Sequence, residues 1–404
     1  MTVADLFGVR VTGPLLPHAE GFSERLTELG YTRLSAADQL RLMAHLSRWL
    51  ASRGLGAGQL TPQRAEQFLR ARRCAGYASR RSQRGLAPLL DYLRGQGVSP
   101  QPMPAAACTP VQRMARDYHV YLVQERGLAA GTIRRYVRDA GLFLTELLGQ
   151  DDGDLGALTP GEVTDFVLRE CRRRGSGSAR NLVASLRSLL RFCYLQGHTT
   201  RELAPAVPAA ASWRGASLPR GVDAGAVSRL LRSCDQRTAM GRRDYAILVL
   251  LSRLGLRVAE VAALTLDDVD WRHGEIVIRG KGGRQERLPL PADAGQALAG
   301  YLSYGRPAAA SRFLFLRMPA PRGGLSPTGI ATIVRAACDR AGLPRAGAHR
   351  LRHGAASEML RAGAGLPEVA QVLRHASLAT TAIYAKVDRA ALRSLARPWP
   401  WSAA

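Results

Sequence analysis

Apolar residues in the first half of the chain recur at the three-to-four-residue spacing of an α-helix. In QLRLMAHLSRWLASRG, one predicted face holds Leu40, Leu42, Met43, Leu46, Trp49 and Leu50. In TIRRYVRDAGLFLTELLG, the equivalent face holds Ile133, Val137, Leu142, Phe143 and Leu147. Residues three and four apart share one side of a helix, so both stretches predict amphipathic helices that bury this face in a core.

Two parts of this helical half resemble each other at an offset of 98 to 100 residues. The stretch GQLTPQRAEQFLRARR matches GALTPGEVTDFVLRECRRR, and RGLAPLLDYLRGQG matches ASLRSLLRFCYLQG. In both copies LTP predicts a helix start, with Thr61 or Thr159 as the N-cap and the proline in the first turn. An offset of this size is a domain length, so we expect two tandem helical units.

Two stretches rich in proline and alanine separate the predicted parts of the chain. They are VSPQPMPAAACTP, residues 98–110, and ELAPAVPAAASWRGASLPRG, residues 202–221. We therefore expect a helical domain, its duplicate, a C-terminal domain and a short tail, at residues 1–100, 107–203, 219–395 and 396–404.

The C-terminal part combines helical patterns with one β-hairpin. The segments GEIVIRG and QERLPL are separated by GKGGR, a glycine-rich turn that carries Lys281. Helices are predicted at residues 224–233, 242–254, 292–304, 328–341, 350–362 and 366–372. The expected fold class is mostly α with a small antiparallel β-sheet in the C-terminal domain, preceded by two tandem helical domains.

The charge balance sets this chain apart from an ordinary folded protein. It has 46% apolar and 22% charged residues, but its formal net charge is +25 and its sequence pI is about 11.1. Such an excess favours a polyanionic partner, most commonly nucleic acid. A basic membrane-surface protein is the alternative, but the chain has no Lys/Arg amphipathic anchor and no apolar run of the roughly 18 residues that span a bilayer.

Cysteine usage and the first residues of the chain indicate where it works. Six cysteines are scattered without a CxxC pair, which is typical of reduced intracellular thiols. The start MTVADLFGVRVTGPLLPHAEG lacks the charged region and apolar core of a signal peptide. We expect a cytoplasmic protein that is associated with the nucleoid.

Six polar residues of the C-terminal domain together have the chemistry to break a DNA strand without a metal ion. They are Arg257, Lys281, His349, Arg352, His375 and Tyr384. A tyrosine hydroxyl can attack phosphorus, two arginines can bind the charged oxygens, and a histidine can accept a proton near neutral pH. The leaving 5′-oxygen needs a transferable proton, which an ammonium can supply and a guanidinium cannot. Among the 57 Lys+Arg only two are lysines, so Lys281 is the candidate acid.

Each of these residues also has a simpler interpretation when it is taken alone. Arg257 could form an ion pair with Glu260, and a glycine-rich hairpin tip tolerates any cation at position 281. His349 and His353 have the i, i+4 spacing of metal ligands, but no glutamate lies between them, and the neighbouring arginines would repel a metal cation. Tyr384 alone would be an ordinary core or surface tyrosine.

The order of the six residues, with the words GLRVAE, HRLRH and LRHASLATTAIY around them, resembles the tyrosine recombinase (phage integrase) family. The resemblance covers residues 222 to 393. It implies that phosphate is bound by Arg257, Arg352 and His375, that the acid is Lys281, that the base is His349 and that the nucleophile is Tyr384. Residues 111 to 198 are similar to the core-binding domain of that family, which implies a SAM-like fold for both helical domains.

Three features depart from the family pattern. Arg374 stands where the family usually has glycine, so we expect it to contact DNA or to alter the turn after Val372. Gly354 stands where threonine or serine is common. The duplicated first unit is the larger departure, because many members have one such domain ahead of the catalytic one. Its segment ARRCAGYASRRSQR predicts DNA contacts beyond those of the core, and a solvated basic face or a contact between protomers is the alternative.

The resemblance implies a site-specific DNA recombinase that cuts and rejoins strands through a 3′-phosphotyrosyl intermediate. That intermediate preserves the energy of the phosphodiester bond, so no cofactor and no metal is expected. The implied partners are double-stranded DNA recombination sites bound by a homotetramer, with no membrane. The extra N-terminal unit favours the integrase of a mobile element. The alternatives are type IB topoisomerase-like DNA relaxation, chromosome or plasmid dimer resolution, and a DNA-binding protein with an inactive site.

Overall fold

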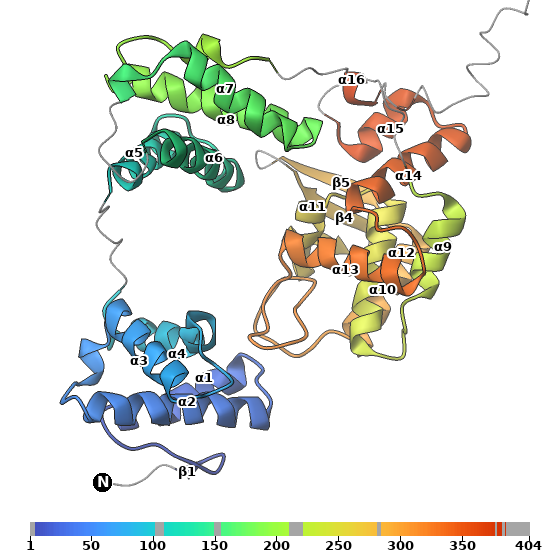
Figure 1. Ribbon diagram of the computed structural model, residues 1–404. Coiled ribbons are helices and arrows are strands. Elements are labelled where there is room, and N and C mark those ends of the chain that lie inside the picture. Colours follow the sequence, from blue (N-terminus) through green and yellow to red (C-terminus); the bar gives the residue numbers. More distant parts are fainter. Residues whose placement is uncertain are drawn as a thin grey trace, which may run out of the picture. The chain divides into compact units, whose positions relative to one another are not determined.

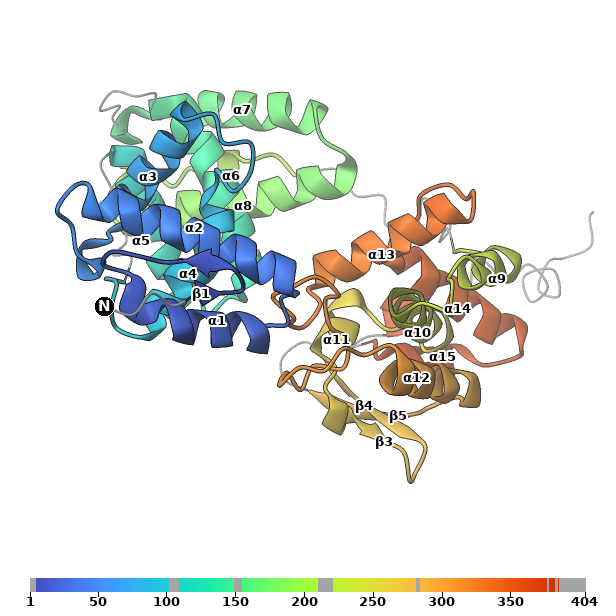
Figure 2. The ribbon, with the colours of Figure 1, turned by 90° about the horizontal axis from the view of Figure 1, so that it is seen from below.

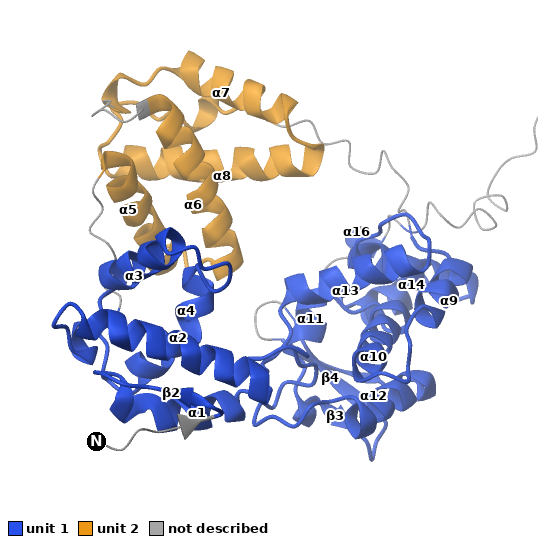
Figure 3. Cartoon of the chain, turned by 60° about the horizontal axis from the view of Figure 1, so that its bottom comes forward, with its two compact units in different colours: residues 1–102, 217–404 blue, residues 103–216 orange. Residues whose placement is uncertain are grey.

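The computed structural model describes residues 5–101, 109–148, 155–209, 221–280, 284–375, 378–381 and 384. Most of these residues lie in helices, and the short strands form two small antiparallel sheets (Figure 1). The expected fold class is confirmed. The chain divides into two compact units, one of residues 1–102 and 217–404 and the other of residues 103–216 (Figure 3). In the described parts of the chain, no helix is both long enough and apolar enough to cross a membrane.

The front part of the first unit is helical and has its own buried cluster. Its elements are β1 (Asp5–Leu6), β2 (Val9–Arg10), α1 (Ala19–Glu28), α2 (Arg33–Ala51), α3 (Pro62–Cys74) and α4 (Gln83–Gly95). The predicted apolar face of α2 is confirmed, because every member is buried except Trp49, which is partly buried. The cluster includes Phe22, Leu40, Phe68 and Leu89. A separate domain at residues 1–100 remains a prediction, since one compact unit joins them to residues 217–404.

The second unit consists of α5 (Pro110–Gln124), α6 (Ala130–Leu148), α7 (Pro160–Arg172) and α8 (Ser176–Leu195). Aromatic side chains help to fill its core, where Phe143 and Phe166 meet edge to face with ring centroids 5.0 Å apart. One position of the predicted face of α6 is wrong, because Leu142 is 47% exposed. The buried side of α6 follows Ile133, Ala140, Phe143 and Leu144. Leu142 precedes Phe143 and therefore lies about 100° around the helix from it.

The two LTP words begin helices as predicted. Thr61 caps α3 by accepting a hydrogen bond from the N–H of Arg64 at 3.3 Å, with Pro62 in the first turn. Thr159 caps α7, and the carboxylate of Glu162 in turn accepts a hydrogen bond from the N–H of Thr159 at 2.8 Å. These contacts satisfy N–H groups that have no partner within a helix.

The rest of the first unit packs around one buried helix. Its helices are α9 (Ala224–Arg232), α10 (Ala239–Arg253), α11 (Val258–Ala263), α12 (Ala292–Tyr304), α13 (Pro327–Arg340), α14 (Ala348–Arg361), α15 (Leu366–Leu373) and α16 (Leu378–Thr381). Helix α10 contacts α9, α11, α12, α13 and α14 (Figure 2). Every residue from Ala246 to Leu251 is at most 1% exposed, so no face of α10 meets solvent along that stretch. The helices predicted for this region are confirmed.

The predicted hairpin is also confirmed, and a third strand joins it. The sheet consists of β3 (Val269–Asp270), β4 (Glu275–Arg279) and β5 (Gln285–Pro289), in that order and antiparallel. Arg279 stands opposite Gln285, and the N–H of Gly280 donates to the carbonyl of Arg284 at 2.7 Å. Lys281, which stands between β4 and β5 in the sequence, lies outside the described residues.

Close packing explains the glycine at position 354. The N–H of Val222 donates to the carbonyl of Arg350 at 3.1 Å, so the segment before α9 runs directly against α14. A Cβ on Gly354 would lie 2.3 Å from the carbonyl oxygen of Val222. A serine or threonine at this position would therefore push the two segments apart.

Candidate active site

Arg257 lies at the start of α11, where the chain turns after α10. The turn includes Gly255, whose φ of +57° is a left-handed conformation that glycine adopts readily. The backbone N–H and the side chain of Arg257 both donate to the carboxylate of Glu260, at 2.8 and 2.7 Å. The ion pair predicted between these residues is therefore confirmed. It holds Arg257 in place while leaving its side chain 43% exposed.

Arg352 lies on α14 and is almost fully buried. Its guanidinium donates to the carbonyl of Gly255 at 2.6 Å and to the carbonyl of Leu373, at the end of α15. Burial, followed by the charges of Arg257 and Arg374, lowers the pKa of Arg352 to about 10. The group stays protonated at neutral pH, so a permanent positive charge sits beside the turn that carries Arg257.

Three histidines lie near these arginines. The rings of His349 and His353, one turn apart on α14, have centroids 4.3 Å apart. Burial and neighbouring positive charge lower the pKa of His349, and lower the pKa of His353 and His375 to about 4. All three are therefore neutral at pH 7, and a neutral imidazole offers one donor and one acceptor nitrogen.

The ring of Tyr384 is buried, and its hydroxyl lies against a histidine. The ring belongs to a cluster with Ala356, Val369 and Leu373. The Oη of Tyr384 lies 2.7 Å from Nδ1 of His353, so the two groups share a hydrogen bond whose donor is set by the tautomer of the imidazole. The ring also stacks parallel to that of His375, with centroids 6.3 Å apart. Burial raises the pKa of Tyr384, and the charges of Arg352 and Arg257 oppose that rise.

The structure brings five of the six predicted site residues into one cluster. The members of this cluster are Arg257, His349, Arg352, His375 and Tyr384. The charges of its two arginines lower the pKa of both of its histidines and oppose the rise in the pKa of its tyrosine, which shows that these side chains lie close together. The position of Lys281 relative to this cluster remains a prediction. Within the described ranges, no three His, Cys, Asp or Glu side chains are grouped as ligands for a metal ion.

Two contacts of this cluster are not visible in sequence spacing. The i, i+4 pattern places His349 and His353 on one side of a helix, but only the fold shows that His353 holds the hydroxyl of Tyr384. Arg374 keeps the left-handed turn that a glycine would make, with φ of 54°. Its side chain is 4% exposed and pairs with Glu260 at 2.8 Å, so in this structure it contacts that carboxylate, and a DNA contact or an altered turn remains a prediction.

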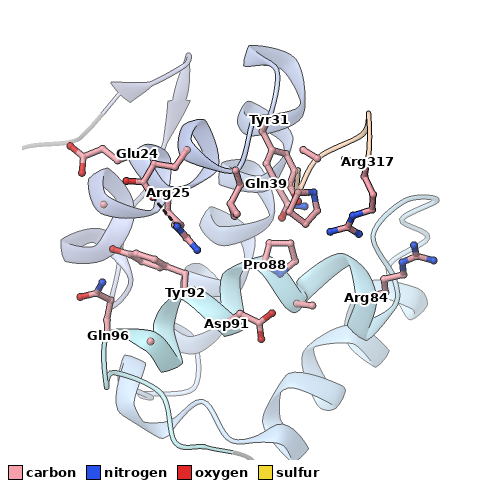
Figure 4. Close-up of a pocket in the computed structure, with 17 residues that line it drawn as sticks. Glu24, Arg25, Tyr31, Gln39, Arg84, Pro88, Asp91, Tyr92, Gln96 and Arg317 are labelled. Atoms are coloured by element: carbon pink, nitrogen blue, oxygen red, sulfur yellow. Dashed lines mark hydrogen bonds and ion pairs between the residues drawn. The ribbon is translucent and has the colours of Figure 1, made fainter. Parts of the chain in front are cut away.

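A hollow elsewhere in the first unit contains none of these residues. It measures about 880 Å³ and is lined by α1, α4 and a loop that carries Arg317 (Figure 4). Its walls mix charges of both signs, with Arg25 and Arg84 beside Glu24 and Asp91. An anionic nucleic acid would meet both attraction and repulsion there, so we assign the hollow no part in strand cleavage.

Two family models match the chain. The phage integrase family matches residues 221–390, and the phage integrase N-terminal SAM-like domain matches residues 115–197. The protein y4rA of Sinorhizobium fredii, named as an integrase/recombinase, is 42% identical over 402 residues, which are 97% of this chain and 96% of the relative. The tyrosine recombinase XerD of Mycobacterium tuberculosis is 34% identical over 303 residues, covering 69% of this chain and 94% of XerD.

Solved structures with this fold include two recombinases in complex with DNA. The recombinase XerH, bound to palindromic difH substrate in a post-cleavage complex, gives a TM-score of 0.57 at 20% identity over 83% of this chain and 94% of XerH. A λ integrase tetramer bound to a Holliday junction gives a TM-score of 0.52 at 16% identity. The match covers 80% of this chain and 90% of the λ integrase chain. The near full-length identity with y4rA and the match of both domain models show that this chain belongs to the phage integrase family, the tyrosine-type site-specific DNA recombinases.

Proposed function

We propose that Tyr384 attacks the scissile phosphodiester and stays joined to the 3′ end of the cut strand. The observation that carries this proposal is the hydroxyl of Tyr384 beside Arg352, Arg257 and His375, held 2.7 Å from Nδ1 of His353. A bond forms between phosphorus and the tyrosine oxygen while the bond to the 5′-oxygen breaks. The phosphodiester energy is kept, so the reverse attack rejoins strands without a nucleotide.

The neighbouring side chains supply charge and proton transfer in this proposal. Arg257 and Arg352 bind the nonbridging oxygens, on which charge develops in the transition state. His349, neutral at pH 7, accepts the proton from Tyr384, and Lys281 gives a proton to the 5′-oxygen. His375, also neutral, donates to the phosphate, while His353 holds the hydroxyl of Tyr384 until DNA binds.

We further propose that the enzyme acts as a homotetramer on two double-stranded DNA sites, as the integrase of a mobile element. The λ integrase tetramer on a Holliday junction shares its fold, and y4rA, which matches nearly the whole chain, is named as an integrase/recombinase. A cytoplasmic location beside the nucleoid belongs to the same proposal, because the proposed substrate is intracellular DNA and the net charge of +25 favours contact with it.

A nicked suicide substrate made from the DNA that flanks the gene tests this function. We expect a covalent complex whose DNA is attached to the peptide containing Tyr384, formed in EDTA and without nucleotide. Cleavage at one sequence supports a recombinase, and cleavage at many positions by a monomer supports topoisomerase-like relaxation instead. Loss of cleavage in EDTA that zinc restores would contradict the proposal and favour a metal at His349 and His353.

The first hundred residues are proposed to bind DNA beyond the contacts of the core. Three arginines of the arginine-rich segment make contacts within the fold. The engaged arginines are Arg72, buried over the ring of Tyr77 at 4.1 Å, Arg73, paired with Glu66 at 2.6 Å, and Arg80, paired with Asp38 at 3.1 Å. Arg81 and Arg84 are exposed and form no ion pair with any described residue. These two side chains are the best placed to reach phosphate groups.

Replacing Arg81 and Arg84 together with alanine should weaken DNA binding and flatten its salt dependence. The slope of the logarithm of the DNA-binding constant against the logarithm of the salt concentration changes by about 0.9 for each phosphate contact. Loss of two contacts should therefore make this slope shallower by about two. The control pair Arg25→Ala and Arg41→Ala removes equal charge from arginines that already pair with Glu28 and Asp38, and it should leave the slope unchanged.

Deletion of residues 1–100 extends this test to the whole N-terminal helical region. The footprint on DNA should shorten, while Tyr384 should still attack a minimal core site if the remaining chain keeps its thermal transition. An unchanged footprint together with an unchanged salt slope would contradict DNA binding and leave a contact between protomers as the better explanation.

A further inference from the structure

Arg374 occupies a backbone position that favours glycine. It ends α15 in the left-handed conformation, with φ of 54° and ψ of 52°, and its N–H donates to the carbonyl of Gln371 at 3.0 Å. Residues with a Cβ are disfavoured in this region, and glycine is the common residue there. The backbone alone therefore gives no reason for an arginine, and the reason has to come from the side chain.

The side chain of Arg374 is buried against a carboxylate that also binds Arg257. Its Nη2 donates to Oε2 of Glu260 at 2.8 Å, and its Nη1 donates to the carbonyl of Val372 at 2.8 Å. The same Oε2 accepts the backbone N–H of Arg257, and Oε1 accepts its guanidinium. Glu260 thus links Arg374 to Arg257. The Nε of Arg374 is buried and has no hydrogen-bond partner among the described residues.

One buried carboxylate serves two arginines at this point. Glu260 is 4% exposed, and burial by itself would raise its pKa; hydrogen bonds from Arg257 and the charge of Arg374 more than offset this, so the pKa lies below its ordinary value. The charge of Arg374 also acts on Arg352 and His375. The side chain is therefore coupled to three members of the cluster, and it is almost fully buried.

We propose that Arg374 is a positioning residue for DNA cleavage. Arg374 keeps Glu260 charged and oriented, and Glu260 in turn directs Arg257 toward the scissile phosphate. This inference rests on the proposed function of Arg257 and Tyr384. With Arg374 removed, Glu260 loses one of its two cationic partners, and the constraint on Arg257 weakens. Since Arg257 acts on the charge that develops at phosphorus, the cleavage step should suffer more than DNA binding.

The test compares Arg374→Gly with the wild type on two substrates. Glycine suits the left-handed turn, so this change removes the guanidinium without straining the backbone. Under saturating DNA, we expect the rate of covalent complex formation to fall by up to about 100-fold, as small misplacements of catalytic groups can cause. DNA affinity should change less than about threefold, because few direct contacts are lost. Arg374→Lys, which keeps the charge, should recover part of the rate.

The second substrate carries a methylphosphonate at the scissile position, which has no charged nonbridging oxygen. If Arg374 acts through Arg257 on that charge, the deficit of Arg374→Gly relative to wild type should shrink on this substrate. A purely structural role would give the same deficit on both substrates, together with a lowered thermal transition. That result, or wild-type rates for Arg374→Gly, would overturn the inference.

Two controls separate this inference from others. Arg80→Gly is the matched variant, because Arg80 is also left-handed, with φ of 53°, and pairs with an acidic residue, Asp38. Its cleavage rate should equal that of wild type. A wild-type chain that forms no covalent complex on ordinary DNA would contradict the proposed function itself. A wild type that cleaves normally beside an equally active Arg374→Gly variant would contradict only the role of Arg374.

Discussion

The Tyr384→Phe variant is expected to form no covalent complex with DNA while it still binds its site. The change removes the attacking oxygen and no charge, and loss of a nucleophile lowers turnover on the order of 10⁴-fold or more. The phenyl ring keeps its packing among Ala356, Val369 and Leu373. The lost hydrogen bond to His353 costs stability on the order of 1 kcal/mol, so the fold should persist. Trapping on a suicide substrate and a binding titration measure the two effects separately.

The matched control for this variant is Tyr301→Phe. Tyr301 is also fully buried in the first unit, and its hydroxyl accepts a hydrogen bond from the N–H of Leu316 at 3.2 Å. Loss of the Tyr301 hydroxyl removes one buried hydrogen bond, as Tyr384→Phe does, but this bond involves no residue of the active-site cluster. Cleavage by Tyr301→Phe should therefore continue. Covalent trapping of the Tyr384→Phe protein would show that another residue is the nucleophile.

The Lys281→Arg variant is expected to lose cleavage nearly as completely as Lys281→Ala. Arginine keeps the positive charge but effectively holds no transferable proton at neutral pH, so it cannot assist the departing 5′-oxygen. Loss of a general acid typically lowers the rate by about 10²- to 10⁴-fold. Single-turnover cleavage at saturating DNA gives the value directly, and DNA affinity should remain close to wild type for Lys281→Arg.

A substrate whose leaving group is a 5′-thiol distinguishes proton donation from DNA positioning. A thiolate leaves without protonation, because its pKa is far below that of an alcohol, so both Lys281 variants should recover cleavage on this substrate. Absence of recovery would assign Lys281 to positioning. Lys386→Arg, at the one other lysine of the chain, is the control and should behave as wild type with either leaving group.

Much of the fold could be predicted because its signals are local. Helix caps such as Thr61 and Thr159 act over three residues, and the hairpin around Lys281 follows from two short strands and a glycine-rich turn. Where the prediction is wrong, the packing of the folded unit decides. Leu142 belongs to an apolar stretch but faces away from the core of its unit, and Arg72 belongs to a basic stretch but is buried over Tyr77. Residue type alone cannot distinguish these outcomes.

By itself, the sequence determined the helical class and the six residues that match one family, and its net charge favoured a polyanionic partner. The tertiary structure decided how those residues are held. The hydrogen bonds of Tyr384 with His353, Arg352 with Gly255 and Arg374 with Glu260 join residues 31, 97 and 114 positions apart. Periodicity reports which side of a helix a residue occupies, whereas a hydrogen bond requires two atoms within about 3 Å, a condition set by the packing of α11, α14 and α15.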